Sequence, residues 1–349
     1  MFAYPFSNRY NLYKIIIFAF GIKIRILKQR YKIFAIINPI SGTANKEYVP
    51  ETIEKTLDKN LFDITVRFTK KPGHATELAR MAIDGGYHGV LAIGGDGTIN
   101  EVASALIDSN VALGVIPCGS GNGLARHLNI PINIEKALEL INDNYIEKID
   151  YCTVNGTPFF CTCGVGFDAH VSEKFAESKK RGPLTYIQKT LVEYLKYRSE
   201  IYNIETADNE ITEKAFVIAC GNASQYGNNA YITPQANMQD GLIDVTVIHP
   251  FTPLDTAVLG ILLFTKHIDQ DTNIHSFRTK ELTIHRPKRG IMHIDGEPMV
   301  MDADLDIKCI HNGLKIFLPE KKKEKKNILA PIEDGFWDFV NAIRDELNI

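Results

Sequence analysis

Two patterns of hydrophobic and polar residues follow one another along the chain, and the change falls near residue 148. Before it, short apolar runs alternate with segments whose apolar residues repeat at helical spacing. Residues 90–93 and 113–116 are wholly apolar, as expected of strands buried on both faces of a sheet. This alternation predicts a mostly parallel sheet with helices on both faces. Strands are expected at 31–37, 63–68, 90–93 and 113–116, and helices near 75–83, 99–106 and 134–141.

After residue 148 the pattern is that of hairpins. Asn155-Gly156 separates two β-rich segments and is a strong signal for a two-residue β-turn. Only one long helix is expected, at 183–197. The second half is therefore predicted to be an antiparallel β-sandwich. Its strands are expected at 151–154, 157–163, 215–220, 242–248, 277–284, 291–294, 305–310 and 314–318.

These patterns divide the 349 residues into four segments. Residues 31–147 form the α/β domain, which resembles a Rossmann-type nucleotide domain, and 148–319 form the β-rich domain. Residues 320–349 are expected to be a charged linker and a last helix. Because that helix has an apolar stripe, including Phe336 and Phe339, we expect it to pack on the first domain.

Residues 1–30 form a basic leader with no acidic side chain. Its apolar stretch, 15–22, is too short to cross a bilayer, which takes about 20 residues. The leader fits three interpretations: a dispensable or wrongly started segment, a peripheral membrane contact, or an export signal.

Composition excludes some functions. A net charge of -3 argues against a nucleic-acid-binding protein, which needs a basic surface. The six cysteines contain no C-x-x-C pair, and this favours small buried thiols in a reducing cytosol. The histidines, His293 among them, lack metal-ligand spacing and are expected to be surface residues or hydrogen-bonded within the fold.

A glycine-rich turn carries the most informative chemistry. Gly94-Gly95-Asp96-Gly97-Thr98 follows a buried strand and leads directly into a helix. Glycines let backbone N–H groups approach a phosphate closely, and the helix N-terminus favours negative charge. Asp96 adds a carboxylate where Mg²⁺ is usually needed. The alternative is a tight turn in which Asp96 only caps the helix.

Two further turns are expected at the same sheet edge. Gly119-Ser120-Gly121-Asn122-Gly123 follows the strand at 113–116, and Asn38-Pro39-Ile40-Ser41-Gly42 follows the first strand. The carboxyl ends of parallel strands share one edge, where α/β proteins bind ligands. Three loops at one edge predict a nucleotide cleft.

Together with a later Asp295-Gly296-Glu297, these motifs resemble the diacylglycerol and sphingosine kinase family over about residues 31–319. The resemblance implies a magnesium-dependent transfer of the ATP phosphate to a lipid hydroxyl, in a cleft between a nucleotide domain and a lipid-binding domain. The implied ATP-site residues are Asn38, Pro39, Ile40, Ser41, Gly42, Thr69, Gly94, Gly95, Asp96, Gly97, Thr98, Ile99, Asn100, Glu101, Gly119, Ser120 and Asn122.

The resemblance also assigns roles to the acidic residues. Glu297 would be the general base, Asp295 a second acidic group, and Asp96 a residue bearing on the metal or on the attacking hydroxyl. Asp240, with main-chain oxygens near Asn237 and Leu242, would form a structural magnesium loop. The lipid entrance would be lined by Gly166, Phe167, Asp168 and His170.

The acceptor lipid stays open at this stage. Gly119-Ser120-Gly121-Asn122 is closer to the sphingosine and ceramide branch than to the bacterial glycerolipid pattern, whereas His170 stands where that branch places an acid. The expected partners are ATP, one lipid and, transiently, the inner face of the membrane, with a homodimer possible and no nucleic acid. The alternatives are an NAD kinase and a catalytically silent lipid-binding protein.

Overall fold

The computed structural model describes residues 30–42, 46–176, 197–252 and 255–320. The leader, nearly all of the helix expected at 183–197, and the C-terminal linker and helix lie outside the described residues, so Phe336 and Phe339 are not placed. Within those ranges no helix is both long and apolar enough to span a membrane.

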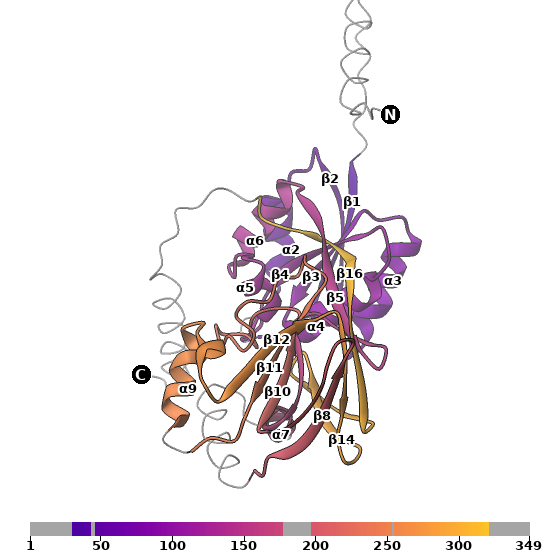
Figure 1. The fold of residues 1–349 in the computed structure, drawn as a ribbon. Coiled ribbons are helices and arrows are strands. Elements are labelled where there is room, and N and C mark those ends of the chain that lie inside the picture. Colours follow the sequence, from indigo (N-terminus) through magenta and orange to yellow (C-terminus); the bar gives the residue numbers. More distant parts are fainter. Residues whose placement is uncertain (1–29, 43–45, 177–196, 253–254, 321–349) are drawn as a thin grey trace, which may run out of the picture.

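Four parallel strands form one half of the larger sheet. They run in the order β2 (Phe62–Phe68), β1 (Tyr31–Ile37), β3 (Gly89–Gly94) and β4 (Ala112–Pro117). Every residue of β3 and β4 is buried, and the predicted doubly covered parallel sheet is confirmed. Figure 1 shows α2 and α6 to one side of these strands and α3 to the other. The helices are α2 (Val49–Thr56), α3 (His74–Asp84), α4 (Asp96–Leu106), α5 (Gly123–His127) and α6 (Ile134–Asn142).

The same sheet continues into the second half of the chain through its last strand. β16 (Asp304–Phe317) lies beside β4, where Ile316 pairs in parallel with Leu113. Beyond β16 the sheet continues with β13 (Glu281–His285), β8 (Glu200–Thr206) and β9 (Glu210–Ala215). β5 (Ile146–Val154) pairs antiparallel with β16, and β6 (Thr157–Phe159) pairs with β5. One sheet therefore joins the two halves (Figure 1).

A second, six-stranded sheet packs against the antiparallel part of the first. Its order is β12 (Ile274–Thr279), β11 (Ile243–Ile248), β10 (Val217–Gly221), β7 (Thr162–Gly166), β14 (Gly290–Ile294) and β15 (Glu297–Met301), all neighbours antiparallel. Between the two sheets lies a hydrophobic core to which both contribute, for example Ile204 and Leu305 from one and Val165 and Val245 from the other. The predicted β-sandwich is confirmed.

Several predicted elements differ in detail. The expected strand at 277–284 is two strands, because β12 belongs to the second sheet and β13 to the first. The expected strands at 305–310 and 314–318 are one strand with an irregularity between Ile310 and Leu314, where Asn312 has φ 57°. Helix α9 (Asp255–Phe264) was not predicted, since its nearly uniform apolar sequence has no amphipathic period.

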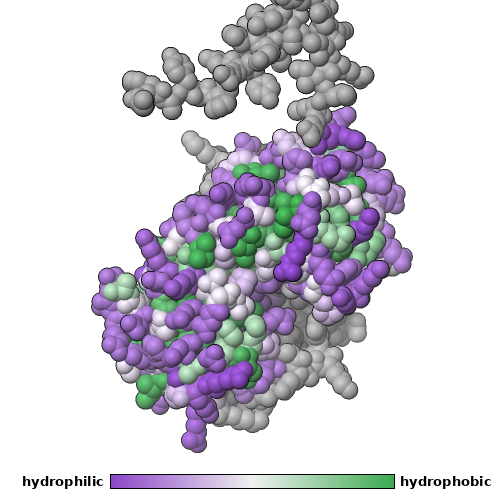
Figure 2. Space-filling model, turned by 90° about the vertical axis from the view of Figure 1, so that its right-hand side faces the viewer, coloured by the Kyte–Doolittle hydropathy of each residue, from purple (hydrophilic) through white to green (hydrophobic). Residues whose placement is uncertain are grey.

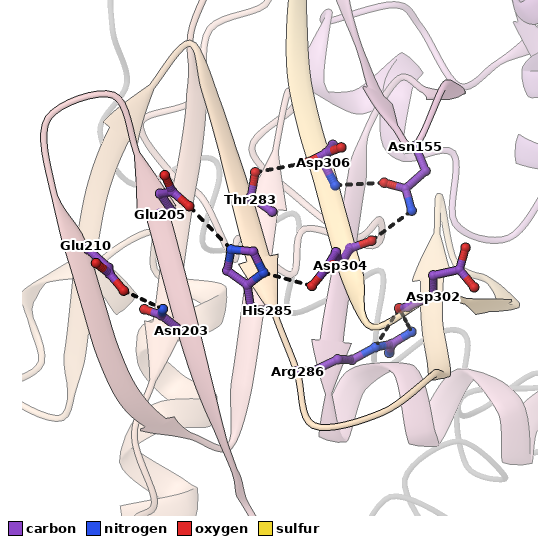
Figure 3. Close-up of polar contacts among 10 residues, drawn as sticks. All are labelled: Asn155, Asn203, Glu205, Glu210, Thr283, His285, Arg286, Asp302, Asp304 and Asp306. Atoms are coloured by element: carbon purple, nitrogen blue, oxygen red, sulfur yellow. Dashed lines mark hydrogen bonds and ion pairs between the residues drawn. The ribbon is translucent and has the colours of Figure 1, made fainter.

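The solvent face of the first sheet carries a polar network (Figure 3). His285 contacts Asp304 at 2.8 Å and Glu205 at 3.4 Å, and the hydrogen bond to Asp304 raises the pKa of His285 above its ordinary value. Asn155 and Asp304 also bond, through the Asn155 amide and the Asp304 carbonyl. The polar side chains of the outer face thus bond to one another, and the opposite, apolar face of the sheet packs against the core.

The junction of the two halves depends on Phe317, which is 1% exposed at the end of β16 and belongs to the core of the α/β half. Phe317→Ala should lower the free energy of unfolding by about 3–5 kcal/mol, because it opens a cavity under the parallel sheet. Urea unfolding followed by circular dichroism measures this. Ile310→Ala is the matched control: it removes a 36% exposed side chain from the same strand, and it should cost about 1 kcal/mol or less. Equal stabilities of the two variants would contradict this account of the junction.

Candidate active site

The three glycine-rich turns meet at the carboxyl edge of the parallel strands. Gly42 has φ 66°, and a Cβ placed on it would lie 2.1 Å from the Cys118 carbonyl oxygen, so only glycine fits there. A Cβ on Gly119 would lie 2.8 Å from the Gly95 Cα. These contacts confirm that the turns lie side by side, as the parallel order of their strands required.

Asp96 ties two of these turns together. Its carboxylate accepts hydrogen bonds from the backbone N–H groups of Asn122 and Gly123, each at 2.9 Å. Helix α4 begins at this residue, and its first intrahelical bond runs from the Ile99 N–H to the Gly95 carbonyl at 3.1 Å. The preceding amides, of residues 96–98, have no acceptor within the helix, which is the usual arrangement at an anion-binding helix N-terminus.

Other predicted ATP-site side chains hold the turns in shape. Asn38 donates from Nδ2 to Thr98 Oγ1 at 2.8 Å, and Asn122, 1% exposed, bonds with both the N–H and the carbonyl of Gly119. Glu101 points to another element: its carboxylate accepts from the amides of Gly73 and Ala75, at the start of α3. A direct role of these side chains in binding ATP stays a prediction.

Thr69 and Ile40 lie at the rim of this edge. The Thr69 N–H bonds to the Ile37 carbonyl at 2.9 Å, immediately before the Asn38 turn. The Ile40 side chain is 87% exposed, whereas Ile99, also predicted at the ATP site, is buried in the core. Ile99 could therefore contact a nucleotide only through its backbone and not through its side chain.

The second acidic motif lies at the tip of the β14–β15 hairpin. Asp295 and Gly296 have φ values of 48° and 84°, so both turn residues are left-handed, as in a type I′ turn. The Asp295 carboxylate accepts from the amides of Phe160, Cys161 and Thr162 at 2.9, 2.7 and 3.0 Å. Burial raises the pKa of Asp295, and these amide hydrogen bonds oppose that rise.

This hairpin lies against the phosphate-type turn of the other half of the chain. Asn100, in the second turn of α4, donates from Nδ2 to Asp295 Oδ2 at 2.8 Å. Glu297 is exposed, and its carboxylate has no hydrogen-bond or ion-pair partner among the described residues. Sequence-distant Asp96, Asp295 and Glu297 are thus brought to one region, with Asp295 fixed and Glu297 available.

Arg286 anchors the base of the same hairpin. It is 8% exposed, and its guanidinium donates to the main-chain carbonyls of Gly290, Ile291, Met301 and Asp302. Figure 3 shows the contact with Asp302. Burial lowers its pKa. Because these carbonyls belong to both arms and the connection beside them, Arg286 fixes the direction in which the acidic tip projects.

The predicted magnesium loop is a tight turn next to a buried carboxylate. Asp240 Oδ1 accepts the Leu242 N–H at 3.0 Å, and Gly241, with φ 72°, donates to Asp150 at 2.7 Å. Asn237 is exposed, and its Oδ1 accepts from the Gln239 amide at 3.2 Å. Among the described residues no cluster of three His, Cys, Asp or Glu side chains has metal-site geometry. A site here would therefore rest on one carboxylate and main-chain oxygens.

The predicted lipid entrance leads to an aromatic cluster on the outer face of the second sheet. Gly166, with φ 108°, ends β7, and helix α7 (Phe167–Ala176) follows directly. Phe167 stacks on Phe216 with ring centroids 4.6 Å apart, and Phe216 in turn meets Phe251 at 4.9 Å. His170 lies half-buried on α7 with its ring centroid 5.8 Å from that of Tyr197. These rings form an apolar region suited to an acyl or alkyl chain.

Some residues of the site were not predicted. Lys46 is 3% exposed, and its ammonium group donates to the Ser41 carbonyl of the first turn. Asp150 is fully buried and accepts from the Gly241 and Asn312 amides and from His311. No motif marks either residue. The partners of Asp150 are also distant in sequence, whereas Lys46 contacts a residue only five positions away. His293 lies just before the Asp-Gly-Glu motif, and that position was the available signal.

Comparison with known proteins identifies the class of this fold and site. Residues 32–154 match the family model described as "Diacylglycerol kinase catalytic domain". Residues 161–317 match the model described as "YegS C-terminal NAD kinase beta sandwich-like domain". A Yersinia pestis protein named "Probable lipid kinase YegS-like" is 30% identical over 72% of this chain and 86% of its own length. A protein of the same name from Alcanivorax borkumensis is 28% identical over 74% of this chain and 88% of its own length.

A solved structure of a diacylglycerol kinase from Bacillus anthracis str. Sterne shares the fold, with a TM-score of 0.63 at 19% identity over 82% of this chain and 96% of the other. These matches define a kinase with an α/β half and a sandwich half. The chain belongs to the lipid kinase family of the diacylglycerol kinase and YegS-like proteins, and the predicted resemblance is confirmed. For a kinase of this family ATP is the implied phosphate donor.

The contact between the two halves should make stability depend on pH through His127. The His127 Nδ1 atom accepts from the Ser224 N–H at 3.1 Å, and burial, aided by the charge of Lys266, lowers the pKa of His127 from 6.5 to about 4. Between these values the unfolded chain binds more protons, so stability falls as the pH falls from about 6.5 to about 4. Urea unfolding across this range should show a smaller loss for His127→Gln than for wild type.

The matched control is His285→Gln, which removes a partly exposed histidine of the polar network on the first sheet. It should leave the fall between pH 6.5 and pH 4 unchanged. NMR titration of the His127 ring gives the direct reading. A ring that titrates near 6.5 would show that the contact with Ser224 is open to water.

Proposed function

We propose that this chain transfers the γ-phosphoryl group of Mg·ATP to the hydroxyl of a membrane lipid. The observation that carries the proposal is the hydrogen bond between Asn100 and Asp295. It places an acidic turn of the sandwich beside the helix that begins at the Gly-Gly-Asp-Gly turn. Phosphoryl transfer requires charge neutralisation, in-line positioning and a proton acceptor, and this junction offers residues for each.

Within this proposal the acidic residues have separate roles. The lipid oxygen forms a bond to the γ-phosphorus while the bond to the ADP oxygen breaks, and the hydroxyl proton passes to the Glu297 carboxylate. Glu297 suits this role because its oxygens are not engaged among the described residues. Asp295 and Asp96 are held by backbone amides and would position the hairpin and the turns. Bound Mg²⁺ would neutralise charge on the phosphate oxygens.

The residues present also fit the structural magnesium loop. Oxygen ligands are what Mg²⁺ prefers, and the Asp240 carboxylate has one oxygen, Oδ2, that is not bonded to the loop amide. Main-chain oxygens near Asn237 and Leu242 would complete the protein part of the site, with water supplying the rest. Such an ion would fix the loop that precedes β11 and would take no part in the reaction.

The lipid would enter beside the aromatic cluster, from a membrane contacted by α9. On this helix Val258 is 50% and Ile261 63% exposed, while Leu262 and Leu263 pack toward the aromatic cluster. One side of α9 therefore covers the lipid region and the other offers apolar side chains to a bilayer. Figure 2 views the face of the molecule away from α9, where hydrophobic residues form small groups among polar ones. An enzyme of the cytoplasm that acts at the inner membrane face fits this arrangement, and a homodimer remains a prediction.

Two other functions are tested by the same assay. An NAD kinase would share the glycine turns, and one domain description carries that name, but the aromatic cluster against α7 and α9 favours a hydrocarbon chain over a dinucleotide. A silent lipid-binding protein would not require the free Glu297 carboxylate beside the helix that begins at Asp96.

Glu297→Gln should lower kcat for phosphate transfer by about 10²–10⁴-fold, because it removes the proton acceptor and keeps the shape of the side chain. Radiolabelled transfer from Mg·ATP to lipids in mixed micelles measures it, with NAD as a soluble acceptor. Glu210→Gln, on the polar face of the first sheet, is the matched control and should keep wild-type rates. Labelling of NAD with none of lipid would instead support the NAD kinase.

Ile261→Glu should weaken binding to phosphatidylglycerol-containing vesicles by about tenfold, since it removes the most exposed apolar side chain of α9 from the proposed contact. Co-sedimentation measures the bound fraction. Ile201→Glu is the matched control, because Ile201 is 59% exposed on β8 and away from α9. Equal binding by the two variants would show that α9 does not face the membrane.

A further inference from the structure

A buried polar cluster lies between the aromatic cluster and the acidic turn. His293 on β14 is 1% exposed, and its Nε2 atom lies 3.0 Å from Asp168 Oδ2. The Tyr226 hydroxyl donates to the same carboxylate oxygen at 2.9 Å, and the Tyr226 ring meets the His293 ring at 5.6 Å. The Asp168 side chain is only 12% exposed. None of the three residues is needed for the proton transfer proposed above.

The strand register fixes where this cluster lies. His293 pairs with Gly164 of β7, and Gly164 pairs with Ala219 of β10, so these residues share one face of the second sheet. Ala219 belongs to the same buried hydrophobic cluster as Phe167. His293 also precedes Asp295 by two residues, or about 7 Å along a strand. His293 therefore lies two residues further along β14 from the acidic turn, on the face of the second sheet where the hydrocarbon chain would bind.

Gly164 shows that space is reserved for this pair. A Cβ added to Gly164 would lie 2.5 Å from Asp168 Oδ2 and 2.9 Å from His293 Nε2. Any other residue would displace the pair. The strand thus carries glycine where the Asp168 and His293 side chains meet above it.

One atom of the cluster is left without a partner. Asp168 can only accept when ionised, so the His293 Nε2 atom carries the hydrogen of this bond. In the tautomer whose single hydrogen is on Nε2, Nδ1 is an acceptor. Nδ1 is buried and has no hydrogen-bond partner among the described residues. Leaving a buried acceptor unsatisfied costs about 1–3 kcal/mol. A ligand that donates a hydrogen bond there would recover that cost.

We propose that His293 Nδ1 accepts a hydrogen bond from a second donor group of the lipid, next to the hydroxyl that is phosphorylated. The inference rests on the proposed lipid kinase function and narrows its substrate class. Monoacylglycerol has a second hydroxyl, and ceramide has both an amide N–H and a second hydroxyl. Diacylglycerol has no hydrogen-bond donor besides its reacting hydroxyl, and it would leave Nδ1 unsatisfied. The preferred acceptors are therefore lipids that carry a second hydrogen-bond donor beside the reacting hydroxyl, such as monoacylglycerol and ceramide.

The test compares monoacylglycerol, ceramide and diacylglycerol with matched acyl chains in mixed micelles, first for binding of fluorescent analogues and then for phosphorylation. Wild type should prefer the first two over diacylglycerol by about tenfold or more, in Kd and in kcat/KM. His293→Gln keeps an amide that can reach Asp168 and lacks an acceptor at the δ position. It should abolish this preference by raising KM for the lipid, with KM for ATP unchanged.

His293→Asn is the matched variant, because its side-chain oxygen lies near the former Nδ1 position. It should retain part of the preference. Wild type that favours diacylglycerol, or that binds none of the three lipids, overturns the inference, as does a folded His293→Gln variant with wild-type preference. Binding that depends on His293 without phosphorylation would support the inference and refute the kinase function. Phosphorylation without any preference would refute the inference alone.

Discussion

The burial of the Asp295 carboxylate is the constraint on which the rest of the site depends. A carboxylate removed from water is costly unless hydrogen bonds replace its hydration. Here the replacement comes from three successive amides, of residues 160–162, and from the side chain of Asn100. The amides fix the corner between β6 and β7, and Asn100 belongs to the α/β half. Satisfying one charge therefore fixes the hairpin, the corner and the junction between the two halves.

Asp96 applies the same physics on the other side of the junction. Its carboxylate accepts hydrogen bonds from two backbone N–H groups of the second turn and so holds the glycine-rich loops close together. The loops can approach this closely because glycine has no side chain. Both aspartates thus act first as structural ties, which keep the loops in place before a ligand arrives. Such preorganisation lowers the entropy cost of positioning substrates. Glu297, the first residue after the hairpin turn, is exposed, and its carboxylate has no hydrogen-bond or ion-pair partner among the described residues.

Sequence patterns predicted the layers and the meeting of the glycine turns well, because periodicity and parallel order are local or topological properties. The β-rich run at 31–37 matched β1 residue for residue. Sequence patterns failed where the structure depends on pairing between distant strands. The segments of β12 and β13 look like one strand in the sequence but belong to different sheets. His293 was expected to be a surface residue or hydrogen-bonded within the fold, and its bond to Asp168 is of the second kind, but nothing near it in sequence identifies Asp168 as its partner. The motif residues were found, whereas the residues that hold them, such as Arg286 and Asp150, carry no local signal.

The shared strand β16 limits how far the two halves can move relative to each other. Its first residues pair with β13, and most of its length pairs with β5, while its end also lies beside β4 and packs Phe317 under the parallel sheet. A large hinge motion between the halves would break this ladder and expose Phe317, at a cost of several kcal/mol. Adjustment to a bound ligand therefore falls to segments outside the ladder, such as the turn at Asn38 and the helix α9. In the proposed lipid kinase, this division would keep the phosphate site rigid while the lipid side adjusts.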